Sequence, residues 1–134
     1  DEYYPHRKGA TDSEALFLIA LGQGLDRDPQ GAMERALGQL GALARQRGSA
    51  PHVRAACALS DGQRLFALRY SSDDQAPSLY HRWSESRQGW AVVSEPLETD
   101  ETDWTEVPPG SFCTFEQDRV EITRFCPEPL SAAA

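Results

Sequence analysis

The chain has 134 residues, which suits one domain (residues 1–134) with one hydrophobic core. Hydrophobic residues make up 40% of it, which is enough for a globular protein and argues against disorder. The net charge of −8 argues against nucleic acid and anionic membrane surfaces as partners. Apolar runs are far shorter than the ~20 residues of a bilayer span.

The three cysteines are Cys57, Cys113 and Cys126. They form no C-x-x-C pair and their number is odd, so a disulfide scaffold is not expected. This usage indicates a reducing compartment, and we expect a cytoplasmic protein.

The first predicted helix runs from about residue 12 to residue 21. Thr11 and Glu14 have the T-x-x-E spacing of a capping box, and Gly22 and Gly24 end the apolar pattern. The apolar face has helical spacing and comprises Leu16, Ile19 and Ala20, with Phe17 and Leu21 beside them.

The second predicted helix begins at Asp28-Pro29, with Asp as the N-cap and Pro at the first helical position. It continues to about Gln46, and Gly48 lies where a helix stop is expected. Its apolar residues recur at 3.6-residue spacing: Met33, Ala36, Leu37, Leu40, Leu43 and Ala44.

After Pro51 the apolar residues recur at every second position instead of at helical spacing, which predicts strands. Asp61-Gly62 is typical of a hairpin turn. About six strands are expected, over residues 53–59, 63–70, 79–83, 90–94, 111–115 and 120–125. Two helices followed by hairpins predict an α+β fold, a helix pair packed on a mostly antiparallel sheet. Because helices cover only one face of such a sheet, a second sheet or a partner is expected on the other.

The cysteines are not convincing nucleophiles. Cys57 lies on the apolar phase of its predicted strand, as a small buried hydrophobic residue does. If Phe115 pairs near Val120, Cys113 lies opposite Ile122, and Cys126 lies beyond it, so no disulfide joins the two.

No metal or cofactor site is expected. His6, His52 and His81 lack ligand spacing, and the acidic loop at residues 98–106 lacks the glycine and closing Glu of an EF-hand. We interpret that loop as solvated.

Asp12 lies in the first helical turn, where the capping box does not need it. One interpretation is a carboxylate stabilised by the helix dipole, worth up to about 1 kcal/mol. The other is a permanently ionised anion that holds a substrate ammonium group. The residues alone leave both open.

Two strings resemble class II glutamine amidotransferases, which are N-terminal-nucleophile hydrolases. GATDSEALFLIAL is similar to that family's T-D-S-E helix start, and WAVVSEPLETDETDWTEVPPGSF is similar to its later strand, acidic loop and V-P-P-G turn. The nearest likeness is to small stand-alone members, including ergothioneine-pathway amidohydrolases. It covers about residues 3 to 125.

The resemblance implies a role for Asp12. In the family the Asp of T-D-S-E binds the α-amino group of glutamine or of a γ-glutamyl substrate, so Asp12, with Thr11 beside it, is the predicted substrate-binding pair. The resemblance further implies hydrolysis of an amide through a thioester on a cysteine that begins the mature chain.

The sequence departs from the family at its start. The nucleophile, the Asn-Gly oxyanion segment and the Arg that holds the substrate carboxylate precede T-D-S-E in the family, whereas this chain starts at Asp1. We therefore expect the C-terminal half of an αββα domain, inactive alone, whose sheet is covered by the missing half or a partner chain. The alternative is a non-enzymatic binding module, or a degenerate subunit beside a separate catalytic partner.

Overall fold

The computed structural model describes residues 16–48, 52–96 and 103–127. Two compact units make up the chain. A helical unit comprises Asp1–Pro51 with Cys126–Ala134, and a strand unit comprises His52–Phe125.

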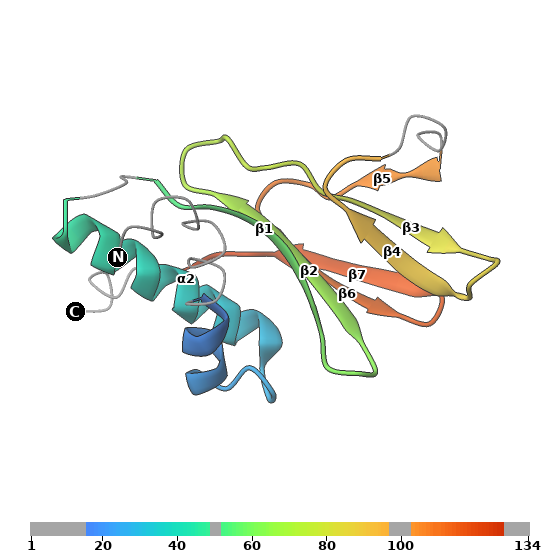
Figure 1. Ribbon diagram of the computed structural model, residues 1–134, viewed down its shortest axis with the longest axis horizontal. Helices are drawn as coiled ribbons and strands as arrows, with labels where there is room; N and C mark the ends of the chain where they lie inside the picture. Colours follow the sequence, from blue (N-terminus) through green and yellow to red (C-terminus); the bar gives the residue numbers. More distant parts are fainter. Residues whose placement is uncertain (1–15, 49–51, 97–102, 128–134) are drawn as a thin grey trace, which may run out of the picture. The chain divides into compact units, whose positions relative to one another are not determined.

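The helical unit contains a helix at residues 16–22 and α2, Pro29–Gln46 (Figure 1). The start of α2 confirms the prediction, because the Asp28 carboxylate accepts a hydrogen bond from the Gly31 N–H at 3.1 Å and Pro29 follows as the first helical residue. Gly48 follows the helix with φ +67°, a left-handed conformation that favours glycine.

The apolar faces of the two helices are buried to different extents along their length. The buried side chains are Leu16, Ala20, Ala32, Met33, Ala36 and Leu37. Phe17, Leu21 and Leu43 are exposed, together with Leu18. The predicted apolar stripe on α2 is therefore buried in the first half of the helix, whereas Leu43, in the second half, is exposed.

In the described residues 52–96 and 103–125, the strand unit contains seven strands (Figure 1). They are β1 Arg54–Ser60, β2 Leu65–Ser71, β3 Tyr80–Ser84, β4 Gly89–Val93, β5 Thr105–Glu106, β6 Ser111–Glu116 and β7 Arg119–Arg124. Six were predicted to within two residues at either end. The two-residue β5 was not predicted and lies in the segment that we expected to be a solvated loop.

The strands divide into two antiparallel sheets where one had been predicted. The four-stranded sheet has the order β1-β2-β6-β7, and the three-stranded sheet has the order β4-β3-β5. The difference arises because β2 pairs with β6, from Leu65↔Phe115 to Arg69↔Ser111, and the chain between them forms its own sheet. The α+β class itself is confirmed.

The register of the last hairpin was predicted correctly. Phe115 pairs with Val120 and Cys113 pairs with Ile122. All three cysteines are free, and Cys126 lies beyond the end of β7.

The core of the strand unit lies between the two sheets. Its buried members are Ala67, Cys113 and Phe115 of the four-stranded sheet, Leu79 directly before β3 and Val107 directly after β5; Trp90 and Val92 of β4 pack against them. Of the two covers considered, a second sheet or a partner, the second sheet is present within the chain and covers one face of the four-stranded sheet. The opposite face carries Phe66, Leu68 and Phe112, which are also buried.

Candidate functional site

The two predicted substrate-binding residues, Thr11 and Asp12, lie outside the described residues, as do Glu14 and His6. The described part of the first helix begins at Leu16, four residues after Asp12. The substrate-binding role therefore stays a prediction.

The cysteines of the strand unit have the properties of neutral thiols. Cys113 is fully buried between the sheets, and Cys57 is half-buried on β1. Burial raises the pKa of each thiol to about 11. Since the thiolate is the nucleophile, neither group is suited to attack a substrate at neutral pH.

Cys126 is exposed and belongs to the helical unit. Its backbone N–H donates to Glu34 Oε2 at 2.8 Å, which attaches the end of the described chain to α2. Within residues 16–48, 52–96 and 103–127, no three histidine, cysteine or acidic side chains gather as metal ligands.

A buried arginine holds the two sheets together. Arg69, on β2, has only 8% of its surface exposed. Its Nε donates to the Pro77 carbonyl at 2.7 Å, and its Nη1 donates to the Val107 carbonyl at 2.6 Å and to Glu106 Oε2 at 2.9 Å. Because Glu106 is more than half exposed, the carbonyl oxygens are the main partners that compensate for burying the charge.

The V-P-P-G string surrounds this arginine and has a structural role. Val107 is fully buried, and its N–H donates to the Leu79 carbonyl at 2.8 Å. Gly110 has φ +73°, donates its N–H to the Arg69 carbonyl at 2.7 Å and accepts from the Phe125 N–H at 2.9 Å. These bonds bring the start of β6 and the end of β7 to the same point on β2.

Sequence reasoning missed Arg69. The available signal was its phase, because Arg69 alternates with Leu65 and Ala67 on the face of β2 that points to the three-stranded sheet. An arginine in phase with buried apolar residues predicts a buried cation that needs acceptors. Glu106, which we assigned to a solvated loop, is one of them.

A second ionic group closes the open end of the β1–β2 hairpin. Arg54 donates to the Asp73 carboxylate at 2.5 Å, and Ser71 Oγ donates to the same carboxylate. The hydrogen bonds from Arg54 and then from Ser71 hold the pKa of Asp73 well below its usual range. The group is compact and fully paired, and we interpret it as structural.

A histidine lies in the layer between the sheets. His81, on β3, is 5% exposed, and its ring lies 5.4 Å from the Phe115 ring and 5.9 Å from the Trp90 ring, centroid to centroid. Burial lowers its pKa, so the imidazole is neutral at neutral pH. Sequence reasoning treated His81 only as a possible metal ligand and missed this position.

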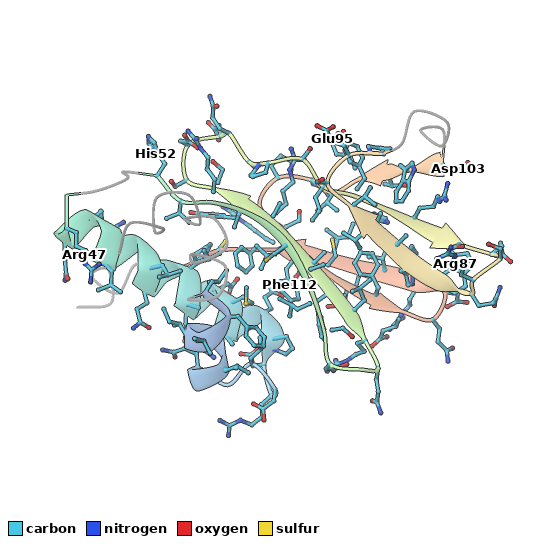
Figure 2. All side chains as sticks on the ribbon, viewed as in Figure 1. Arg47, His52, Arg87, Glu95, Asp103 and Phe112 are labelled. Carbon is cyan, nitrogen blue, oxygen red and sulfur yellow. The ribbon has the colours of Figure 1, made fainter. Side chains whose placement is uncertain are left out.

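The V-V-S-E-P string ends a strand, as predicted. Val93 is the last residue of β4, and the Ser78 hydroxyl donates to the Ser94 carbonyl at 2.7 Å. Glu95 follows at the surface, and Asp103 lies at the surface before β5 (Figure 2).

No helix in the described part of the chain is long and apolar enough to cross a membrane. No protein-family model and no curated protein matches the chain. A solved structure does: "glutamine aminotransferase class-II domain protein" from Silicibacter pomeroyi is 56% identical, with a TM-score of 0.81, over 96% of this chain and 57% of that one.

This chain belongs to the class II glutamine amidotransferase family. The resemblance found in the two strings is thereby confirmed at the level of the family and of the fold. The chain spans 57% of the length of the protein that it matches.

Proposed function

We propose that the protein containing this chain hydrolyses glutamine or a γ-glutamyl amide. The observation that carries the proposal is the 56% identity to a glutamine aminotransferase class-II domain protein over 96% of the chain. The T-D-S-E string supports it, because it supplies Asp12 at the position where the family binds the substrate α-amino group.

The nucleophile in this proposal is the thiolate of an N-terminal cysteine that is not among Cys57, Cys113 and Cys126. The thiolate attacks the amide carbonyl, the carbon–nitrogen bond breaks, and ammonia leaves after taking a proton. A γ-glutamyl thioester remains on the sulfur. Water, or an amine acceptor, then displaces the thiol and releases the glutamyl product.

Asp12 has the role of orienting the substrate. Its carboxylate pairs with the substrate ammonium group, and Thr11 lies next to it in the sequence. An ion pair to a part of the substrate that does not react fixes the amide carbon relative to the nucleophile. We expect it to act mainly through substrate binding, and hence through KM.

The partner of this chain in the proposal is the rest of the domain. The matched structure extends well beyond the part that this chain covers. We propose that the additional segment, whether on the same polypeptide or on a partner chain, carries the nucleophile and oxyanion hole and covers a free sheet face. The chain by itself is then inactive.

The test is a glutaminase assay on the full-length protein with the substitution Asp12→Asn. We expect kcat/KM to fall about 10- to 100-fold, mostly through KM, because one charged hydrogen-bonded contact to the substrate is lost. Asp26→Asn is the matched control, since Asp26 is an exposed carboxylate in the same unit. Equal KM values for the two variants would refute the role of Asp12.

The binding-module alternative makes a different prediction in the same assay. A degenerate subunit gives no glutamine or γ-glutamyl amide turnover in the full-length protein, even with Asp12 intact. Turnover by the isolated chain would instead contradict its predicted dependence on an external cysteine.

A further inference from the structure

The three-stranded sheet and its flanking residues hold every buried side-chain nitrogen that lacks a hydrogen-bond partner among the described residues. These atoms are Nδ1 and Nε2 of His81, Nε1 of Trp90 and Nε1 of Trp104. His81 is on β3, Trp90 is on β4, and Trp104 precedes β5. Since buried polar groups in proteins are almost always paired, this concentration calls for a ligand.

His81 and Trp90 belong to one site, because both contact Phe115 across the layer between the sheets. The ring centroids lie 5.4 Å apart for His81 and Phe115 and 5.1 Å apart for Trp90 and Phe115. His81 and Trp90 are themselves 5.9 Å apart at an interplanar angle of 62°. Trp104 forms a separate pair, with the Arg82 guanidinium 4.7 Å from its ring.

The chemistry of the two rings restricts the ligand. A neutral imidazole presents one N–H donor and one acceptor nitrogen, and burial favours the neutral ring of His81. An indole N–H only donates. The complementary group must therefore accept from Trp90 and also exchange hydrogen bonds with His81, which a hydroxyl-type group does and a bare cation does not.

We propose that His81 and Trp90 bind an ordered water molecule between the two sheets. The water accepts the hydrogen bond of Trp90 Nε1 and bonds to a ring nitrogen of His81. The ring centroids of His81 and Trp90 lie 5.9 Å apart, so the unpaired nitrogens of both side chains lie in the same part of this layer. Buried waters of this kind satisfy polar groups that the fold leaves unpaired.

The neighbouring side chains favour a neutral ligand. Phe115 on β6 and Val92 on β4 line the layer beside His81, and both are apolar. Cys113 contributes a neutral thiol, because burial keeps its pKa far above neutrality. Arg69 on β2 is the charged group of this layer, and it is already paired with carbonyl oxygens and Glu106.

The test uses nuclear magnetic resonance of the full-length protein with ¹⁵N-labelled tryptophan. We expect a cross-peak from a long-lived water at the Trp90 indole proton. Trp83 is the internal control, because its Nε1 donates to Glu85 Oε2 at 2.8 Å on the surface and needs no buried water. Absence of the Trp90 cross-peak would overturn the proposal.

A crystal structure of the unmodified full-length protein is the second measurement and does not depend on any variant folding. We expect a water peak within hydrogen-bond distance of Trp90 Nε1 and of one His81 ring nitrogen. A protein atom from another segment at this position would overturn the proposal. In His81→Phe the residence time of water at Trp90 should shorten at least tenfold, whereas Trp83 should be unchanged.

Discussion

The two sheets of the strand unit differ in how far the described residues bury their side chains and pair their buried polar groups. In the four-stranded sheet, Phe66, Ala67, Leu68, Phe112, Cys113 and Phe115 are buried, and they lie on both of its faces. The strands of the three-stranded sheet are mostly half-buried, and its edge strand β5 has two residues. Among the described residues, the unpaired buried side-chain nitrogens lie with the three-stranded sheet and its flanking residues.

This difference shows where the strand unit is complete. The four-stranded sheet has long paired strands and apolar side chains that are buried within the chain itself. The three-stranded sheet has a two-residue edge strand and, among the described residues, the buried side-chain nitrogens that lack a hydrogen-bond partner. The following experiments test that division.

The largest effect is expected from Phe115→Ala, because Phe115 contacts both sheets. It is 2% exposed and packs against His81 and Trp90. Truncation should lower the free energy of unfolding by about 3–5 kcal/mol, since it leaves a cavity between the sheets. Chemical denaturation of the full-length protein measures it.

Ile122→Ala is the control on the same sheet. Ile122 lies on edge strand β7 and is 43% exposed, so a loss of about 1 kcal/mol or less is expected. If both variants lost the same stability, the layer between the sheets would not be the core of this unit.

The next effect concerns the connection between the sheets, tested by Arg69→Met. Methionine retains most of the apolar stem but leaves the Pro77 and Val107 carbonyls without their donor. A loss of about 2–4 kcal/mol is expected from the unpaired carbonyl groups. Hydrogen exchange should show faster opening of β5 and β3 than of β1.

Arg64→Met is the matched control, because Arg64 is on the same hairpin and donates to no buried carbonyl of the described residues; it forms an exposed ion pair with Asp61, and its guanidinium lies 5.0 Å from the centre of the Phe66 ring. It should cost less than about 1 kcal/mol. Glu106→Gln should also have a small effect, since Glu106 is mostly exposed. A large loss in Glu106→Gln would mean that the ion pair, rather than the carbonyl bonds, holds the sheets together.

The smallest effect is a pH dependence located at His81. Its pKa is lowered in the folded protein because burial disfavours the charged ring, so the unfolded chain binds more protons near pH 6. Above about pH 6.5, His81 is neutral in both the folded and the unfolded chain and does not change the free energy of unfolding with pH. Below that, the free energy of unfolding falls as the pH decreases toward the folded pKa, by less than about 1.4 kcal/mol per pH unit.

Hydrogen exchange, corrected for intrinsic rates, measures where this loss occurs. Between pH 7 and pH 5 we expect β3 and β4 to lose more protection than β2 and β6. His81→Phe should remove this difference. Equal losses in the two sheets, or a persistent difference in the variant, would assign the titration to another group.

Local features of the fold were predictable because neighbouring residues determine them. Asp28-Pro29 sets the start of α2 through side-chain capping and a fixed φ, and both act within one turn. The register of Cys113 with Ile122 follows from the short turn between β6 and β7. In each case the decisive partners are close in sequence.

The division into two sheets was not predictable in the same way. Alternation gives the faces of a strand and not the identity of its neighbours. The pairing of Leu65 with Phe115 joins residues far apart in sequence. Strand β5 has two residues and no alternation of apolar residues. It is identified as a strand only by its pairing with Tyr80 and His81 of β3.

The candidate site was predicted from the family strings and not from physical pattern alone. Asp12 has the same local signature whether it is only a carboxylate stabilised by the helix dipole or also binds a substrate. Arg69 and His81 show the opposite case: each interrupts an apolar face, but its significance depends on acceptors or rings supplied by other strands.

The connection between β2 and β6 has a consequence for the order of folding. The whole three-stranded sheet is inserted in the chain between these two neighbouring strands, so pairing them closes a loop of about 40 residues. The β3–β4 hairpin, which is local, shortens that loop when it forms first. Arg69 and Gly110 lie at the two ends of this loop, and the hydrogen bond from the Gly110 N–H to the Arg69 carbonyl, at 2.7 Å, forms where the loop closes.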